Sequence, residues 1–181
     1  MDFQPLEIPD VMLLTPNVFG DERGFFMETF RQNEFEEHCG PWSFVQENHS
    51  RSAYGVLRGL HYQLENPQGK LVRVSQGEVF DVAVDLRASS PTFGQWVGRY
   101  LSEENKQLLW VPPGFAHAFL VTSEVADFQY KCTAYYAPGD EHCICWDDAQ
   151  LDIDWPAMTN PPQVSKKDRA GLAFEQAPYF K

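Results

Sequence analysis

No stretch of this 181-residue chain is continuously apolar over the about 20 residues that a membrane-spanning helix requires. The first ten residues are acidic and interrupted by proline, so they lack the basic start and apolar centre of a secretory signal. At this length one domain with one substantial core is expected. We therefore expect a single domain, residues 1–181, located in the cytoplasm and not associated with membranes.

Basic residues are scarce. The chain has 14 lysines and arginines against 26 aspartates and glutamates, which gives a formal net charge of −12. Such a chain is not expected to bind nucleic acids or anionic membranes nonspecifically, because both require a basic surface. If the ligand is an anion, a local basic cluster must hold it against the overall field.

Cysteines are also few, and none is arranged as the CxxC pair of a zinc site. A reducing compartment disfavours disulfides, so we interpret Cys39, Cys132, Cys143 and Cys145 as buried small hydrophobic residues. Cys143 and Cys145 would share one face of a strand, and metal binding there is the lesser alternative.

Helical signals are rare, whereas short β-like runs bounded by Gly, Pro, Asn and Asp recur. This spacing is typical of an all-β sandwich or barrel. The predicted strands are Val11–Leu14, Gly24–Thr29, Ser43–Ser50, Val56–Gln63, Lys70–Gln76, Glu78–Leu86, Trp96–Leu101, Gln107–Val111, Ala118–Thr122, Ala126–Tyr136 and Cys143–Trp146. Asn33 is predicted to cap a helix over Glu34–His38 that ends at Gly40, Ser102–Asn105 to begin a single turn, and Ser165–Asp168 to form a capping box.

The strand over Val56–Gln63 carries the most informative pattern. Alternation places His61 and Gln63 on one side, and the turn before Lys70 predicts that the next strand folds back beside it. Lys70, Arg73 and His61 would then form an interior site that takes a proton and holds negative charge. The alternative is an ordinary surface hairpin.

Several other polar residues lie on predicted strands. Asp81 and Asp85 share a face of a nearly continuous apolar run, and pairing with Arg73, Arg87 or a backbone amide is a better interpretation than catalysis. His117 follows a Pro-Pro-Gly turn and is a second candidate inward histidine. Tyr130 and Tyr136 share a face, where both could simply direct their hydroxyls to water.

Taken together, the motifs resemble the dTDP-4-dehydrorhamnose 3,5-epimerase family over about residues 8–169. They are Val18–Phe26, Phe44–Ser50, Val56–Gln63, Gln68–Arg73, Gly77–Leu86, Pro91–Trp96, Gly114–His117 and Ser165–Asp168. The resemblance implies a cupin-type double-stranded β-helix (jelly roll) with a few short peripheral helices and no metal or organic cofactor. It also implies a homodimer with an exchanged N-terminal arm, about residues 1–30, and an irregular C-terminal segment, about residues 147–181.

The implied reaction is epimerisation of C3 and C5 of dTDP-4-dehydro-6-deoxy-D-glucose to dTDP-4-dehydro-L-rhamnose. It needs a base, an acid on the opposite face and a group that stabilises the enolate. His61 suits the base, since imidazole has an ordinary pKa of about 6.5. The resemblance implies that Asp168 orients His61 and that Tyr130 donates the proton. Lys70 is the candidate for the enolate, with His117 as a second polar group nearby.

The resemblance also implies the binding residues. Arg23, Arg58 and Lys167 would meet the diphosphate, for which guanidinium groups give bidentate contacts. Arg23 and Glu28 would reach the neighbouring subunit's site. The other implied contacts to nucleotide or sugar are Gln46, Glu47, Asn48 and Glu141, and the aromatic residues Phe19, Phe26 and Tyr136 either stack on thymine or belong to the core.

Three alternatives remain open. A metal-dependent cupin would use His61 and His117, but Gln63 stands where its next histidine is expected and Lys70 adds positive charge. Epimerases that act at one carbon, and ketoisomerases, would use the same scaffold and substrate class. A non-catalytic cupin that binds a sugar nucleotide would not need the base and the acid.

Overall fold

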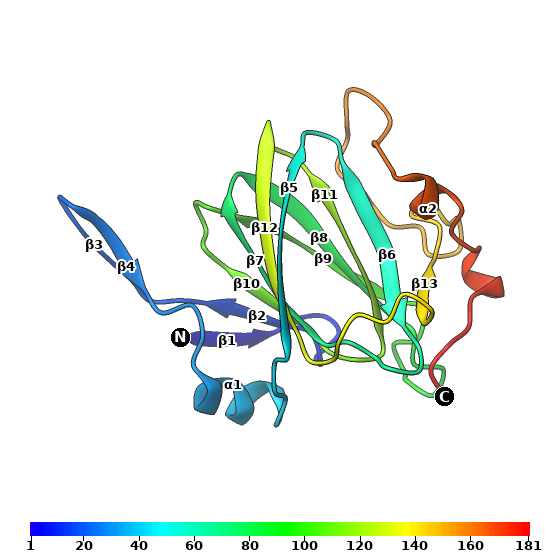
Figure 1. The fold of residues 1–181 in the computed structure, drawn as a ribbon, viewed down its shortest axis with the longest axis horizontal. Helices are drawn as coiled ribbons and strands as arrows, with labels where there is room; N and C mark the ends of the chain where they lie inside the picture. The colour runs from blue at the N-terminus through cyan, green and yellow to red at the C-terminus, as the bar shows by residue number, and fades with distance from the viewer.

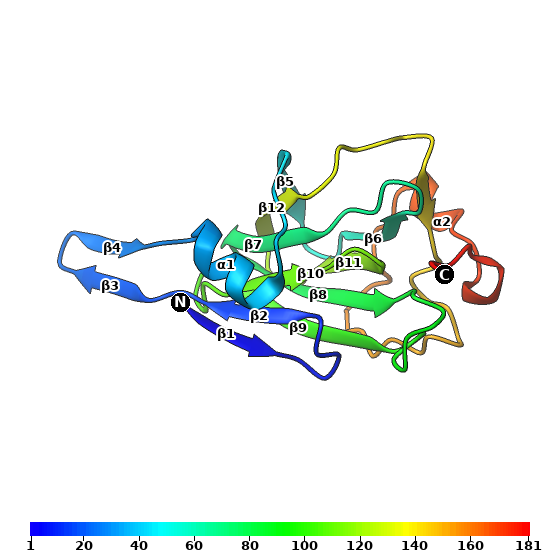
Figure 2. The ribbon, with the colours of Figure 1, turned by 90° about the horizontal axis from the view of Figure 1, so that it is seen from below.

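Two antiparallel sheets face each other in the computed structural model, which describes all 181 residues (Figures 1 and 2). The larger sheet has the order β1 (Asp2–Pro5), β2 (Met12–Thr15), β10 (Leu108–Val111), β7 (Lys70–Gln76), β12 (Val125–Cys132) and β5 (Gln46–Ala53). The smaller has the order β13 (Glu141–Cys143), β6 (Leu57–Gln63), β11 (Phe115–Val121), β8 (Glu78–Asp85) and β9 (Trp96–Ser102). The prediction of an all-β jelly roll is confirmed.

The main core lies between the two sheets. Val72 and Phe128 from the larger sheet pack in one cluster with Ala83 and Val121 from the smaller sheet. A second cluster lies on the outer face of the smaller sheet, where the C-terminal segment covers it with Phe174 and other side chains. Because both of its faces are covered, β11 is buried at every residue.

The interior site depends on the connection between β6 and β7, for which the sequence-based prediction was wrong. β7 does not fold back beside β6; it pairs with β10 and β12 in the opposite sheet. The loop between β6 and β7 crosses from one sheet to the other, and the Asp140 carboxylate accepts three of its backbone N–H groups. Lys70 therefore faces His61 across the interior. Arg73, three residues further, has the opposite orientation in β7 and lies outside this site.

The short helices agree with the predictions in part. Helix α1 covers Gln32–Cys39 and ends at Gly40 as predicted, but Arg31 is its N-cap residue, so Asn33 lies inside the helix. Helix α2 covers Lys166–Arg169, and Ser165 caps it by accepting a hydrogen bond from the Asp168 amide, as predicted. A 3-10 helix, η1, covers Phe174–Gln176. The segment Ser102–Asn105 forms a hydrogen-bonded turn.

A two-stranded hairpin, β3 (Val18–Asp21) and β4 (Gly24–Met27), projects from the body of the molecule (Figure 1). The prediction missed β1 and β3, and it extended the strand of β12 beyond Cys132. Phe19, Phe25 and Phe26 are exposed on the hairpin. None of the helices has the length and apolar character that crossing a membrane requires.

Candidate active site

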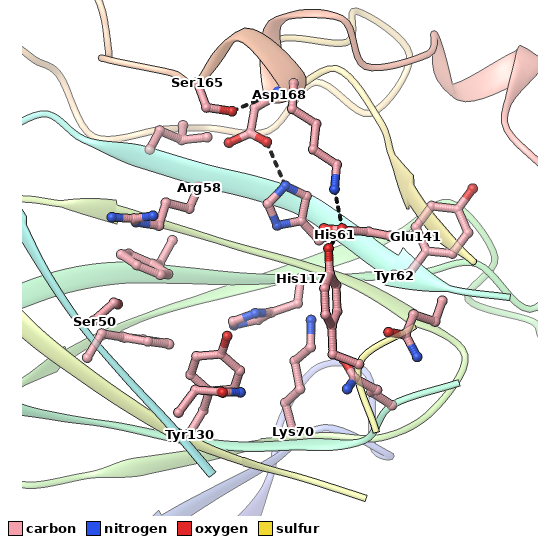
Figure 3. Close-up of a pocket in the computed structure, with 18 of the residues that line it drawn as sticks. Ser50, Arg58, His61, Tyr62, Lys70, His117, Tyr130, Glu141, Ser165 and Asp168 are labelled. Atoms are coloured by element: carbon pink, nitrogen blue, oxygen red, sulfur yellow. Dashed lines mark hydrogen bonds and ion pairs between the residues drawn. The ribbon is translucent and has the colours of Figure 1, made fainter. Parts of the chain in front are cut away.

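A cavity of about 540 Å³ opens between the two sheets (Figure 3). The four predicted catalytic residues, His61, Lys70, Tyr130 and Asp168, all line it. Most of the predicted binding residues do so too, namely Gln46, Asn48, Arg58, His117, Tyr136, Glu141 and Lys167. The surface-hairpin alternative for His61 and Lys70 is therefore wrong.

His61 is held by a buried carboxylate. Its Nε2 donates to Oδ1 of Asp168 at 2.7 Å, which leaves Nδ1 without a protein partner. Burial acts to raise the pKa of Asp168, but the hydrogen bond and charge of His61, together with hydrogen bonds from the Ser165 side chain and the Gly59 backbone, outweigh it and hold the pKa below its ordinary value. The carboxylate thus stays ionised and fixes the tautomer in which Nδ1 can accept a proton.

Close packing beneath this pair depends on Gly59. Its φ is +125°, and a Cβ there would lie 2.4 Å from Cβ of Ala118 and 2.5 Å from the carbonyl oxygen of His117. The absence of a side chain lets β6 approach β11, where His61 is the cross-strand neighbour of His117. Two imidazoles thereby lie side by side on one wall.

The opposite wall supplies a phenol and an amine. Tyr130 and Lys70 come from β12 and β7 of the larger sheet, across the cavity from His61 (Figure 3). Burial raises the pKa of Tyr130, so its hydroxyl remains protonated and can donate. Burial lowers the pKa of Lys70, and nearby Cys132, Glu141 and Asp81 act against that shift.

The cavity is more basic than the protein as a whole. Arg58, Lys70 and Lys167 line it, and Arg58 is anchored by hydrogen bonds to Ser52 Oγ at 3.1 Å. At the rim, Glu141 accepts hydrogen bonds from Lys167 and from the Tyr136 hydroxyl. Burial acts to raise the pKa of Glu141, but these two bonds keep it lowered, so this carboxylate is an ion-pair partner.

Five predicted binding residues lie away from the cavity. Phe19 and Phe26 are 66% and 70% exposed on the projecting hairpin, so the interpretation of them as core residues is wrong. Arg23 is paired with Asp21 at the hairpin tip, and Glu28 is paired with Arg31. Glu47 points out of β5 and pairs with Lys131 at 2.8 Å, because its neighbours Gln46 and Asn48 take the inward positions.

The structure adds lining residues that the sequence analysis did not propose. Ser50 continues the inward alternation of Gln46 and Asn48 along β5, so the period of two could have identified it. Its Oγ is buried and has no hydrogen-bond partner. Gln163 also lines the cavity, but it comes from an irregular segment without a periodic signal.

One group of side chains could hold a metal ion. Ligand atoms of His61, Cys143 and Asp168 all lie within 4.8 Å of one another. Burial raises the pKa of the Cys143 thiol to about 12, and the His61 and Asp168 atoms are already bonded to each other, so the donor set fits a metal poorly. Nε2 of His117 is likewise hydrogen-bonded, to Asp81. Neither histidine therefore has this nitrogen free, as a ligand in a metal-dependent cupin would.

The cysteines form no disulfide. Cys132 is buried, as predicted, whereas Cys39, Cys143 and Cys145 are partly exposed. The Sγ of Cys145 donates to the carbonyl oxygen of Gly171 and does not belong to the group around His61. The predicted alternative of a metal between Cys143 and Cys145 thus gains no support from the arrangement.

Comparisons with known proteins point to one family. Residues 5–176 match the family model described as dTDP-4-dehydrorhamnose 3,5-epimerase. A curated protein of that name from Pseudomonas aeruginosa is 62% identical over 176 residues, covering 97% of each chain. A crystal structure of dTDP-6-deoxy-D-glucose-3,5-epimerase from Legionella pneumophila, in complex with dTDP-4-keto-L-rhamnose, is 52% identical with a TM-score of 0.95 and covers 98% of this chain and 94% of that one.

A further solved structure has a narrower specificity. It is a 3'-monoepimerase from Streptomyces bikiniensis in complex with dTDP-quinovose, 32% identical with a TM-score of 0.87. The match covers 93% of this chain and 86% of that one. The same fold therefore accommodates epimerases that act on one carbon.

Proposed function

The chain belongs to the dTDP-4-dehydrorhamnose 3,5-epimerase family, and from this premise we propose how its own residues epimerise C3 and C5 of dTDP-4-dehydro-6-deoxy-D-glucose. The observation that carries the proposal is the placement of His61 and Tyr130 on opposite sheets with a cavity between them. A proton can thus leave one face of the sugar ring and return to the other.

His61 is the base. Its free Nδ1 takes the proton from the carbon next to the C4 ketone, while Nε2–H stays hydrogen-bonded to Asp168. The carboxylate stabilises the imidazolium that forms, because the charge-assisted hydrogen bond is stronger than the neutral one. The acidity of these carbons depends on the ketone, so both C3 and C5 are open to the same chemistry.

Lys70 and His117 receive the negative charge that develops on the C4 oxygen. An ammonium in a partly water-excluded cavity stabilises an enolate more strongly than it would in water. Tyr130 then returns a proton from the opposite side. Its raised pKa keeps the hydroxyl protonated before the transfer.

Arg58 and Lys167 bind the diphosphate from within the chain. Because Lys167 is paired with Glu141, the incoming anion exchanges with this carboxylate as a partner of Lys167. Gln46, Asn48 and Tyr136 bind nucleotide or sugar at the rim. The proposal also includes a cytoplasmic location, which suits four cysteines without disulfides.

We assign Arg23, Glu28, Phe19 and Phe26 to the site of a neighbouring copy. All four lie outside this chain's own cavity, and the two phenylalanines are exposed on a hairpin that extends from the body (Figure 1). Neighbouring exposed aromatic side chains are typical of surfaces that contact another molecule. A homodimer with exchanged arms would provide that surface and complete each cavity.

The reaction is tested by proton NMR of chelator-treated protein in D2O with dTDP-4-keto-6-deoxyglucose. We expect deuterium at both C3 and C5. We also expect the product to be a substrate for the reductase that yields dTDP-rhamnose. Label at only one carbon would place the chain among the monoepimerases. Absence of exchange would favour a ketoisomerase, a different sugar nucleotide or a binding protein.

The arm assignment is tested by mixing two inactive variants, Arg23→Ala and His61→Ala. In a mixed dimer, the site with intact His61 can receive an arm with intact Arg23, so activity should return on subunit exchange. His61→Ala mixed with Asp168→Ala is the matched control, because both lesions belong to the cavity wall. Equal activity in both mixtures would contradict arm exchange.

A further inference from the structure

Two buried aspartates on strand β8 are held in contrasting ways. Asp85 accepts hydrogen bonds from the Arg87 guanidinium, the Arg87 amide and two neighbouring hydroxyl groups. The Asp81 carboxylate has a single hydrogen-bond partner, His117, whose Nε2 lies 2.9 and 3.0 Å from its two oxygens and donates to them. Asp81 is fully buried. The hydrogen bonds and the arginine that stabilise Asp85 are thus lacking at Asp81.

Asp81 is not paired with the arginine on its neighbouring strand. Arg99 is its neighbour on β9, but the Arg99 guanidinium is paired with Glu7 at 2.8 Å. Burial raises the pKa of Asp81, and the charges of His117 and Lys70 act against that rise. The carboxylate is therefore coupled to two side chains that line the cavity and not to a structural arginine.

Lys70 is the cationic side chain on which the charge of Asp81 would act. It makes no ion pair, and its amine lies beside His117 in the cavity (Figure 3). Burial lowers its pKa, and Cys132, Glu141 and Asp81 oppose that shift. The titratable groups that face it come from five strands and are His61, Asp81, His117, Tyr130, Cys132 and Glu141.

Most of these groups cannot supply a free negative charge. Burial raises the pKa of the Cys132 thiol, which keeps it neutral, and Glu141 is already paired with Lys167. The only side chain that donates hydrogen bonds to the Asp81 carboxylate is His117. Of the two carboxylates that act on Lys70, Asp81 is thus the one that is not paired with another lysine or arginine.

We propose that Asp81 is a positioning residue for the epimerisation, one that keeps Lys70 cationic and His117 in a single tautomer. With Nε2–H donated to Asp81, His117 keeps Nδ1 free for the substrate. The negative charge behind the imidazole favours the ammonium form of Lys70 at the place where the enolate oxygen develops. This inference rests on the proposed function of Lys70, but its central claim concerns a protonation state that is measured without substrate.

The test compares Asp81→Asn with Asp85→Asn, a matched change at a buried carboxylate of the same strand that does not touch the cavity. Protein labelled with 13C at lysine Cε is titrated by NMR. The chain has only six lysines, so the Lys70 signal is assigned by its loss in Lys70→Met. The pH dependence of kcat is measured on the same proteins.

In Asp81→Asn, we expect the pKa of Lys70 to fall by about one unit and the alkaline limb of kcat to move down by the same amount. Asp85→Asn should move neither. An unchanged Lys70 titration, with kcat reduced equally at every pH, would overturn the proposal and leave Asp81 a structural residue.

The wild-type titration can refute the proposal even if Asp81→Asn does not fold. A Lys70 that is already neutral at pH 7 would contradict the proposal, whereas one that titrates above about pH 8 supports it. If substrate exchange fails but Lys70 behaves as expected, the proposed function is at fault and the coupling to Asp81 stands.

Discussion

Replacing Asp168 by asparagine isolates the charge that we propose orients His61 as the catalytic base. The side chain keeps its size and its place at the N-terminal end of α2, where the backbone amide donates to Ser165. The amide can turn its NH2 group toward His61, and Nε2 must then accept a hydrogen bond. The imidazole would carry its proton on Nδ1, which faces away from Asp168 and could no longer accept a proton from the substrate.

The expected loss follows from the bond that is removed. The 2.7 Å contact between His61 and Asp168 becomes a hydrogen bond between charged partners when His61 is protonated. Such bonds contribute about 1.5–3 kcal/mol. Each 1.36 kcal/mol changes a rate tenfold, so kcat should fall roughly 10-fold to 150-fold.

The assay is deuterium incorporation at C3 and C5 under saturating substrate, with the thermal midpoint measured in parallel. Asp148→Asn serves as the control, since Asp148 accepts backbone hydrogen bonds in the C-terminal segment and does not line the cavity. The control should lose stability and keep kcat. An Asp168→Asn enzyme with kcat within twofold of wild type would refute the role assigned to the dyad.

Three further changes give distinct results. Tyr130→Phe should retain deuterium exchange at C5 while net epimerisation falls at least about 100-fold, because the base remains and the acid is lost; unchanged product formation by NMR would remove Tyr130 as the donor. Gly59→Ala should lower the free energy of unfolding by more than about 2 kcal/mol in denaturant titration, since its Cβ would collide with Ala118. Burial acts to raise the pKa of Asp85, but the Arg87 hydrogen bonds hold it lowered; the carboxylate therefore stabilises the fold above its ordinary pKa, and the difference in thermal midpoint between wild type and Asp85→Asn should shrink below about pH 4.

Period-two alternation accounts for much of what the sequence predicts about the fold. The strand predicted over Lys70–Gln76 has those bounds in the structure, and the ends of β6 and β8 differ by one residue from prediction. Strand pairing was not predictable in the same way. A turn-forming sequence before Lys70 favours a hairpin, but the loop is held by Asp140, a residue 74 to 76 positions further along the chain than the amides it accepts.

The residues of the candidate site also differ in how well the sequence predicts them. Alternation and motif spacing identified the residues that point inward from strands, including His61, Lys70 and Tyr130. They could not place Glu47, whose side chain has the opposite orientation to those of Gln46 and Asn48 in the same motif. Nor could they predict that Asp81 would pair with His117, because that contact depends on which strands become neighbours, here β8 and β11.

The proposed inversion depends on the crossing of the chain between β6 and β7. Had β7 paired with β6, Lys70 and His61 would share one wall, and Tyr130, which lies on β12 beside β7, would share it too. A base and an acid on one wall would return the proton to the face from which it came. Because the loop carries β7 to the facing sheet, where β12 lies beside it, a sugar ring bound in the cavity would lie between His61 and Tyr130, and inversion becomes the expected outcome.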